Sequence, residues 1–115
     1  MRYSLHPDSE QDLREAAEYY KERAGTALSQ ALFTEFEHSI QLLLRHPLLG
    51  ALWLHGKRRL VMKHFPYSVI YTVASEEIQV LAVAHHSRRP GYWRKRKWQP
   101  QACGAQPGGA GDAAQ

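Results

Sequence analysis

The sequence predicts an α+β domain with the element order β-α-α-β-β-β, in which a helical hairpin packs on a mainly antiparallel sheet. Three observations indicate this order: a short alternating segment opens the chain, two segments with helical periodicity follow, and three segments of strand character come last. The chain has 115 residues, 43% of them hydrophobic, which suits one modest core. We therefore expect one domain over residues 1–98. Residues 99–115 are rich in Gly, Ala, Pro and Gln without periodicity, which predicts a disordered tail.

The first strand and the first helix are expected before residue 25. Residues 2–6, RYSLH, alternate between apolar and polar side chains, which is typical of a short strand that ends at Pro7. Asp8 or Ser9 then serves as the N-cap of a helix that Gly25 ends. Apolar residues recur at helical spacing between these limits: Leu13, Ala16, Ala17, Tyr20 and Ala24. The helix dipole favours the acidic side chains near its start, which are Glu10, Asp12 and Glu15.

A second helix is expected from Thr26 until the His46-Pro47 pair closes it. It carries a wide apolar stripe of Leu28, Leu32, Phe33, Phe36, Ile40, Leu43 and Leu44. Because the link between the helices is so short, they must lie antiparallel. The next segment, PLLGALWLHG, is an apolar loop whose large side chains are expected to tuck under the domain: Leu49, Leu52 and Trp53. Alternatively, Trp53 is exposed and serves as an anchor for a binding partner.

Three strands are expected at residues 57–65, 67–74 and 78–86, joined by tight turns into an antiparallel meander. Alternation gives the first strand one half-basic face. That face carries Arg59, Val61, Lys63 and Phe65, and the other carries Leu60, Met62 and His64. The last segment is apolar at consecutive positions, which is typical of a central strand covered by helices on at least one side.

Composition and charge restrict the class of protein. No run of about 18 apolar residues is present and the N-terminus lacks the apolar stretch of a secretory signal, so we expect a cytoplasmic protein without membrane association. The single Cys103 forms neither an internal disulfide nor a zinc cluster. Residues 1–56 carry a net charge of −3 and residues 57–115 a net charge of +7. The second half therefore favours an acidic partner, either a polyanion or an acidic protein.

The segment HHSRRPGYWRKRKW, residues 85–98, is the main candidate for a functional site. It holds six Lys/Arg, two Trp and one Tyr, which suits nucleic-acid binding, catalysis on phosphate or docking to a protein. Because Pro90-Gly91 breaks the strand, a loop or short helix presents the aromatic residues that follow. The candidate target-binding residues are Arg88, Arg89, Tyr92, Trp93, Arg94, Lys95, Arg96 and Trp98. Tyr92 and Trp93 have the alternative of folding back onto the core, whereas residues 94–97 are expected to stay outside it.

The neighbouring His85 and His86 are expected to point to opposite faces of their strand, so they cannot act as one acid–base pair or chelate one metal ion. One is expected to be buried or to cap the strand, and the other to face the basic surface. No Asp, Glu or Cys stands at ligand spacing nearby. Neither a metal site nor a cofactor is predicted.

The element order, together with FPYSVIYTV and IQVLAVAHHSRRPGYWRKR, resembles the RelE/ParE superfamily of toxins from bacterial type II toxin–antitoxin systems. The stretch AVAHHSRRPGYW is similar to the ParE-like, plasmid-stabilisation branch, and the resemblance spans residues 2–97. It implies a small toxin that is neutralised by a cognate antitoxin encoded beside it, in a toxin–antitoxin hetero-oligomer. ParE-like members inhibit DNA gyrase, which implies growth inhibition by binding and no enzyme activity.

The resemblance leaves two alternatives: a RelE-like ribosome-dependent mRNA endonuclease, and a non-toxic interaction module with the same fold. Metal-independent RNA cleavage needs a base, an acid and cations near the phosphate. The residues that could supply them are Lys57, Arg59, Lys63, Arg88 and Tyr92. The RelE-like pattern, however, places an arginine after the aromatic residue that opens the middle strand, where this chain has Ser68 after Tyr67. The missing charge favours the gyrase inhibitor over the nuclease.

Overall fold

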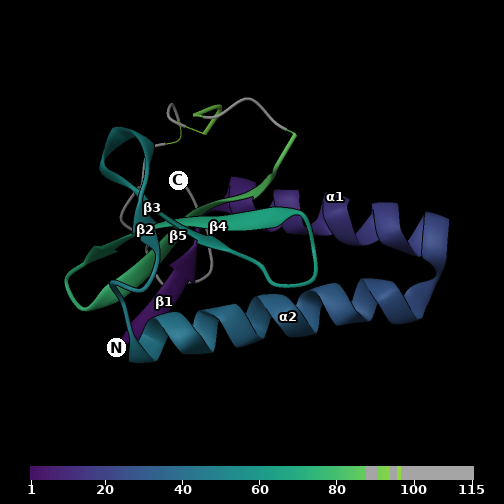
Figure 1. The fold of residues 1–115 in the computed structure, drawn as a ribbon, viewed down its shortest axis with the longest axis horizontal. Helices are drawn as coiled ribbons and strands as arrows, with labels where there is room; N and C mark the ends of the chain where they lie inside the picture. The colour runs from purple at the N-terminus through teal and green to yellow at the C-terminus, as the bar shows by residue number, and fades with distance from the viewer. Residues whose placement is uncertain (88–90, 94–95, 97–115) are drawn as a thin grey trace.

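A computed structural model describes residues 1–87, 91–93 and 96 of the chain. Two antiparallel helices lie against one side of a five-stranded sheet (Figure 1). The elements follow the predicted order with one short extra strand and a 3₁₀ turn: β1 Arg2–Leu5, α1 Pro7–Ala24, α2 Thr26–Arg45, β2 Ala51–Leu52, η1 Leu54–Gly56, β3 Arg58–Val61, β4 Tyr67–Ala74 and β5 Glu77–His85. The predicted α+β architecture is confirmed. No helix of the described part of the chain is both long and apolar enough to span a membrane.

The sheet has the strand order β1-β5-β4-β3-β2. Strands β3, β4 and β5 form the predicted antiparallel meander, whereas β1 pairs with β5 in parallel. The sheet is therefore mixed, and β5 has a neighbour on both sides, as expected of a central strand. Strand β1 ends at Leu5, which pairs with Val80, while β5 continues to His85. The second half of β5 consequently has an edge that β1 does not cover.

Helix α1 begins earlier than predicted, because His6 is its N-cap and not Asp8 or Ser9. The Nδ1 atom of His6 accepts a hydrogen bond from the backbone N–H of Asp8 at 3.0 Å. Pro7 occupies the first helical position, where its missing N–H costs nothing and its fixed φ favours the helix. Gly25 ends α1 at φ 97°, a conformation that disfavours other residues, and α2 starts at the next residue. The predicted antiparallel hairpin follows from this abrupt turn.

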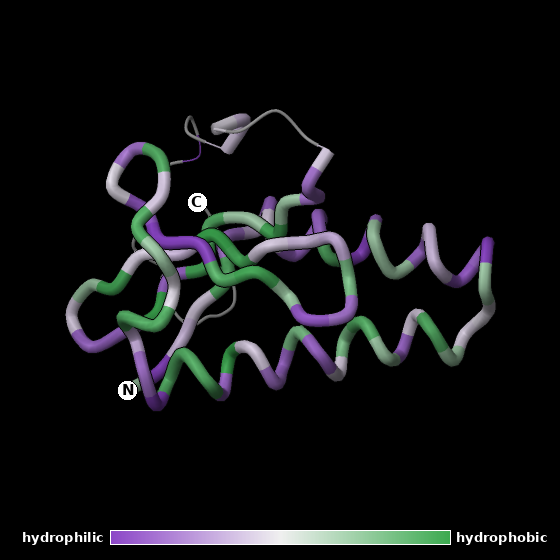
Figure 2. Tube along the Cα trace, viewed as in Figure 1, coloured by the Kyte–Doolittle hydropathy of each residue, from purple (hydrophilic) through white to green (hydrophobic). Residues whose placement is uncertain are grey.

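The main core lies between the hairpin and the sheet. Apolar residues concentrate on the central strands and recur along α2 (Figure 2). Buried side chains of α2 pack with inward-facing residues of β4 and β5: Leu32, Phe36, Ile40 and Leu43 with Val69, Tyr71, Ile78 and Val80. Toward the N-terminal end of the predicted stripe, Leu28 and Phe33 are 37% and 41% exposed. These two residues do not belong to the core.

A smaller core covers the opposite face of the sheet. It consists of Ile70, Leu81, Ala82 and Trp93, with Trp53, Ala84 and Tyr92 against it. Two consecutive residues of β5 reach this face because the pairing register shifts there: Ile70 is opposite Ala82, whereas Tyr71 is opposite Val80. Leu81 is thus the extra residue of a β-bulge, which turns it to the same side as Ala82. The apolar character of both faces of β5 reflects cover on both sides.

The segment between α2 and β3 differs most from its prediction. Leu49 and Leu52 are 49% and 69% exposed, so they do not tuck under the domain, and only Trp53 is half-buried. Tyr71 organises this segment instead. Its hydroxyl donates a hydrogen bond to the Pro47 carbonyl at 2.8 Å and accepts one from the Gly50 N–H at 2.9 Å. The chain is thereby held against the sheet through backbone polar groups, which leaves the leucine side chains outside.

Strand β3 is shorter than the predicted 57–65 and ends at Val61. The turn that follows is bound to α2 by Glu35, whose carboxylate accepts hydrogen bonds from the His64 backbone N–H at 2.7 Å and contacts the His64 Nδ1 at 2.7 Å. Met62 and Phe65 are buried, while His64 lies on the surface. Side-chain alternation therefore stops at Val61. Beyond it, the backbone N–H of His64 bonds to the Glu35 side chain of α2 and not to a neighbouring strand.

Candidate functional site

The predicted target-binding residues fall into two groups. Five of them lie outside the described residues: Arg88, Arg89, Arg94, Lys95 and Trp98. The other three, Tyr92, Trp93 and Arg96, are described and all contact the folded domain. Their contacts define how the C-terminal segment is held on the sheet.

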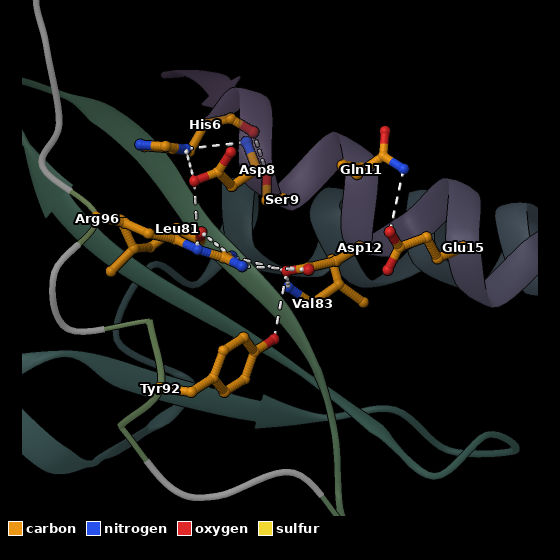
Figure 3. Close-up of polar contacts among 10 residues, drawn as sticks. All are labelled: His6, Asp8, Ser9, Gln11, Asp12, Glu15, Leu81, Val83, Tyr92 and Arg96. Atoms are coloured by element: carbon orange, nitrogen blue, oxygen red, sulfur yellow. Dashed lines mark hydrogen bonds and ion pairs between the residues drawn. The ribbon is translucent and has the colours of Figure 1, made fainter.

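Arg96 forms a bidentate ion pair with Asp12 of α1 (Figure 3). Its Nη1 lies 2.8 Å from Oδ2 and its Nη2 lies 3.2 Å from Oδ1 of Asp12. The Arg96 side chain is only 15% exposed and that of Asp12 only 9%. Burial alone lowers the pKa of Arg96, but the hydrogen bonds and charge of Asp12 outweigh it and raise the pKa above its usual value. The expectation that residues 94–97 stay outside the folded domain is therefore wrong for Arg96.

The ion pair also completes the open edge of β5. Asp12 Oδ2 accepts a hydrogen bond from the Val83 N–H at 3.1 Å, and Arg96 Nη1 donates one to the Leu81 carbonyl at 3.1 Å (Figure 3). Strand β1 ends before this point, so these backbone groups have no strand partner on that side. The side chains of Asp12 and Arg96 thus supply the hydrogen bonds that a longer β1 would supply to β5. The Tyr92 hydroxyl adds a further, longer contact to Asp12 at 3.4 Å.

Trp93 folds back onto the core, which was one of the two expected positions for it. Its side chain is 1% exposed and packs on the face of the sheet away from the helices. The ring of His55 meets it edge-on, with the ring centroids 6.0 Å apart. Gly91 brings the chain back to this site at φ 83°, close to the imidazole of His55. Trp93 in this conformation fixes the C-terminal segment and does not present its indole to a partner.

Of the residues proposed for phosphate chemistry, the structure describes Lys57, Arg59, Lys63 and Tyr92, and two of these, Arg59 and Tyr92, are engaged in other contacts. Arg59 stacks on Trp53, with its Cζ 3.9 Å from the ring centroid, so the indole is covered by a guanidinium and is not a free anchor. Lys57 is half-buried and Lys63 is exposed. Tyr92 bonds to Asp12 beyond the outer edge of β5, two strand spacings, or about 10 Å, from β3. Arg88 lies outside the described residues.

The two neighbouring histidines point to opposite faces, as predicted. His85 meets the Tyr67 ring edge-on at 4.9 Å between centroids and contacts the Ser87 hydroxyl through Nδ1 at 2.7 Å. His86 Nε2 lies 3.0 Å from the hydroxyl of Ser68, which is only 2% exposed. Ser68, where the RelE-like pattern has an arginine, is therefore a buried partner of an imidazole. In the described ranges, no three His, Cys, Asp or Glu residues are grouped as metal ligands would be.

Sequence reasoning missed the role of Asp12, which it assigned only to the helix dipole. A signal was present, because Ser9, Asp12 and Ala16 are spaced three and four residues apart and share one helix face. Ser9 and Ala16 are 1% and 3% exposed, so Asp12 lies on the buried side of α1. An aspartate on a buried face requires a cationic or hydrogen-bonding partner. The sequence does not identify which of its many arginines this is.

Comparisons with known proteins agree with this fold. The family model described as "ParE toxin of type II toxin-antitoxin system, parDE" matches residues 3–90. A solved structure described as the chromosomal ParDE TA system from P. aeruginosa superposes with a TM-score of 0.66 at 20% sequence identity, over 74% of this chain and 95% of that chain. The search of curated proteins gives no match. Because the family model covers most of the described domain, the chain belongs to the ParE toxin family of type II toxin–antitoxin systems.

Proposed function

We propose that this chain arrests cell growth by binding DNA gyrase in the cytoplasm and that a cognate antitoxin neutralises it in a toxin–antitoxin complex. The observation that carries the proposal is the match to the ParE toxin family of type II toxin–antitoxin systems over residues 3–90. The basic C-terminal half supports it, since its net charge of +7 suits an acidic target.

The geometry of the sheet argues against the alternative of an mRNA endonuclease. Acid–base catalysis requires groups within hydrogen-bond reach of the reacting atoms, about 3 Å. The Tyr92 hydroxyl instead donates to the Asp12 carboxylate, and Arg59 is engaged with Trp53. Ser68, bonded to His86, supplies no positive charge for a phosphate. A cleavage site on this face would have to break several of these contacts.

The C-terminal residues divide into two roles under this proposal. Trp93 and Arg96 anchor the segment to the sheet and to α1. The residues proposed to contact the target are Tyr92 and five that lie outside the described residues: Arg88, Arg89, Arg94, Lys95 and Trp98. The anchors limit the freedom of the segment, so that less conformational entropy is lost when the target binds.

Two assays on the purified chain test the proposal. Supercoiling by purified gyrase should be inhibited in proportion to the amount of chain added, while mRNA in a translating extract stays intact. Addition of the protein encoded by the adjacent gene should restore supercoiling. Codon-aligned mRNA cuts with unaffected gyrase would instead establish the endonuclease. A chain that affects neither assay and does not arrest growth would be a non-toxic interaction module.

A further inference from the structure

A pocket lies between α1 and the uncovered edge of β5. It has a volume of about 380 Å³, within the range of small-ligand sites, and its wall includes Asp12, Glu15, Tyr19, Tyr67, Val83 and His85. The polar groups on this wall are carboxylates, hydroxyls and an imidazole. The carboxylate of Asp12 is already paired with Arg96, whereas Glu15 makes one hydrogen bond to the Gln11 amide at 3.1 Å (Figure 3). Glu15 therefore keeps acceptor capacity for a ligand.

Tyr67 is the second observation that points to a ligand. Its side chain is only 8% exposed, yet among the described residues its hydroxyl has no hydrogen-bond partner. The ring is fixed between Tyr20 and His85, with edge-on contacts to both, and the residue lines the pocket. Burial raises the pKa of Tyr67, with smaller effects from neighbouring tyrosines and Asp12, so the hydroxyl stays protonated. A buried hydroxyl without a partner is costly unless something else bonds to it.

The same region already binds guanidinium groups of the chain itself. Asp12 holds Arg96 in a bidentate pair, and the guanidinium of Arg23 lies over the Tyr19 ring at 4.4 Å from its centroid. Carboxylate and aromatic groups are the surroundings that arginine prefers, because its planar fork donates several hydrogen bonds and stacks on rings. The described charges of this region are three acidic groups, Asp8, Asp12 and Glu15, and two guanidinium groups, Arg23 and Arg96.

We propose that this pocket receives an arginine side chain of a partner polypeptide, with Glu15 and the Tyr67 hydroxyl as its hydrogen-bond acceptors. The partner is the cognate antitoxin, and this assignment rests on the proposed function. The acidic α1 surface then recognises a basic residue of the antitoxin, in contrast to the basic C-terminal segment that is proposed for the target.

The first experiment uses N-acetyl-arginine amide as the probe and follows the backbone amides of the isotope-labelled chain by NMR. The probe should shift amides around Tyr67, Val83 and His85, whereas N-acetyl-citrulline amide, which is neutral, should not. Glu15→Gln and Tyr67→Phe should each weaken binding roughly fivefold to tenfold, since the first removes the negative charge opposite the guanidinium and the second removes a hydrogen-bond acceptor. Glu22→Gln, an exposed change on the same helix, is the matched control and should bind as the unaltered chain does.

Equal binding of the citrulline probe, or shifts that the two variants leave unchanged, would overturn the arginine site. Ser87 is followed in the sequence by Arg88 and Arg89, so Arg88→Ala/Arg89→Ala is a further variant. A gain of tenfold or more in its probe affinity would mean that the chain's own arginine fills the pocket, which also contradicts the proposal.

The second experiment measures the affinity of the adjacent-gene protein for the same variants. Glu15→Gln and Tyr67→Phe should weaken the complex about tenfold, with Glu22→Gln unaffected. If the complex forms equally well with all three, the antitoxin does not use this pocket, and the proposed function still stands. If no complex forms with the unaltered chain, the proposed function fails together with the choice of partner, whereas the probe experiment still decides whether the pocket binds arginine.

Discussion

The guanidinium of Arg96 donates hydrogen bonds to both carboxylate oxygens of Asp12, a residue 84 positions earlier in the chain. This contact joins the end of the domain to the first turns of α1 and closes the edge of β5 through Leu81 and Val83. Helix α1 therefore determines where Arg96 lies. Stability and target binding are expected to be separable here, because Trp93 and Arg96 anchor the segment, whereas its other basic residues are proposed to contact the target.

Asp12→Asn should reduce the free energy of unfolding by about 2–4 kcal/mol, because the buried guanidinium of Arg96 then keeps only its longer ion pair with Asp8, at 3.6 Å. Urea denaturation followed by circular dichroism measures this loss. Glu10→Gln, an exposed change one half-turn earlier, should stay within about 0.5 kcal/mol of the unaltered chain. The double variant Asp12→Asn/Arg96→Gln should lose less than the sum of the two single losses. Strict additivity would contradict the ion pair as the cause.

Trp93→Ala should cost about 3–5 kcal/mol, since the indole is 1% exposed and fills the smaller core with Ile70, Leu81 and Ala82. This is a large share of the stability of a domain of this size, about 5–15 kcal/mol. Truncation after Pro90, which removes Trp93 and Arg96 together, should lower the melting temperature still further. A truncated chain that melts like the intact one would show that this segment is not part of the core.

Charge reversal outside the anchors should affect the target and not the fold. Arg94→Glu/Lys95→Glu is expected to weaken inhibition of gyrase most strongly at low salt, since exposed charges act over a Debye length of about 8 Å at physiological ionic strength. The melting temperature should not change. Arg96 is left intact in this variant because reversing it would place two acidic groups together at Asp12.

The matched control for this experiment is Lys21→Glu/Arg45→Glu, which changes the net charge equally on the helices. Equal loss of inhibition in the control would assign the effect to net charge and would remove the C-terminal segment as the contact surface.

Much of the fold could be predicted from the sequence because its signals are local. Gly25 and Pro47 mark the helix ends, and continuous apolar residues in β5 mark a strand covered on both faces. The errors come from contacts between distant residues. The end of β3 depends on Glu35 of α2, and the exposure of Leu49 and Leu52 depends on how Tyr71 holds the backbone before β2. Arg96 was expected outside the fold because its partner is a helix residue far away in sequence.

Glu35 gives the fold a pH dependence that can be measured. Burial raises the pKa of its carboxyl, but hydrogen bonds and the charge of His64, together with the Lys63 backbone, outweigh this and lower the pKa below the ordinary 4.5. The contact thus stabilises the fold fully above pH 4.5 and loses this contribution as the pH falls through the lowered value. Glu35→Gln should therefore flatten the acid limb of stability against pH.

Urea midpoints measured from neutral to acid pH test this expectation, with Glu37→Gln, an exposed neighbour, as the control. At neutral pH the Glu35 variant should be about 1–2 kcal/mol less stable, because an amide accepts the turn's N–H groups less strongly than a carboxylate does. Parallel curves for the unaltered chain and Glu35→Gln would show that another carboxyl controls the acid limb.

The same substitution at two positions of β4 should give opposite results. Tyr71→Phe removes a hydroxyl that bonds to both the Pro47 carbonyl and the Gly50 N–H, and it leaves these backbone groups without a partner. Unfolding in urea should show a loss of about 1–3 kcal/mol.

Tyr67→Phe removes a buried hydroxyl that has no partner among the described residues, so stability should be unchanged or rise by up to about 1 kcal/mol. Both variants keep the ring and its packing, so the difference between them isolates the hydroxyl. Because Tyr67 lines the pocket beside α1, a gain in stability with weaker binding of the arginine probe would mark its hydroxyl as a group retained for a ligand. Equal losses at the two positions would mean that a bond within the fold satisfies the Tyr67 hydroxyl, and the pocket would then lack its buried acceptor.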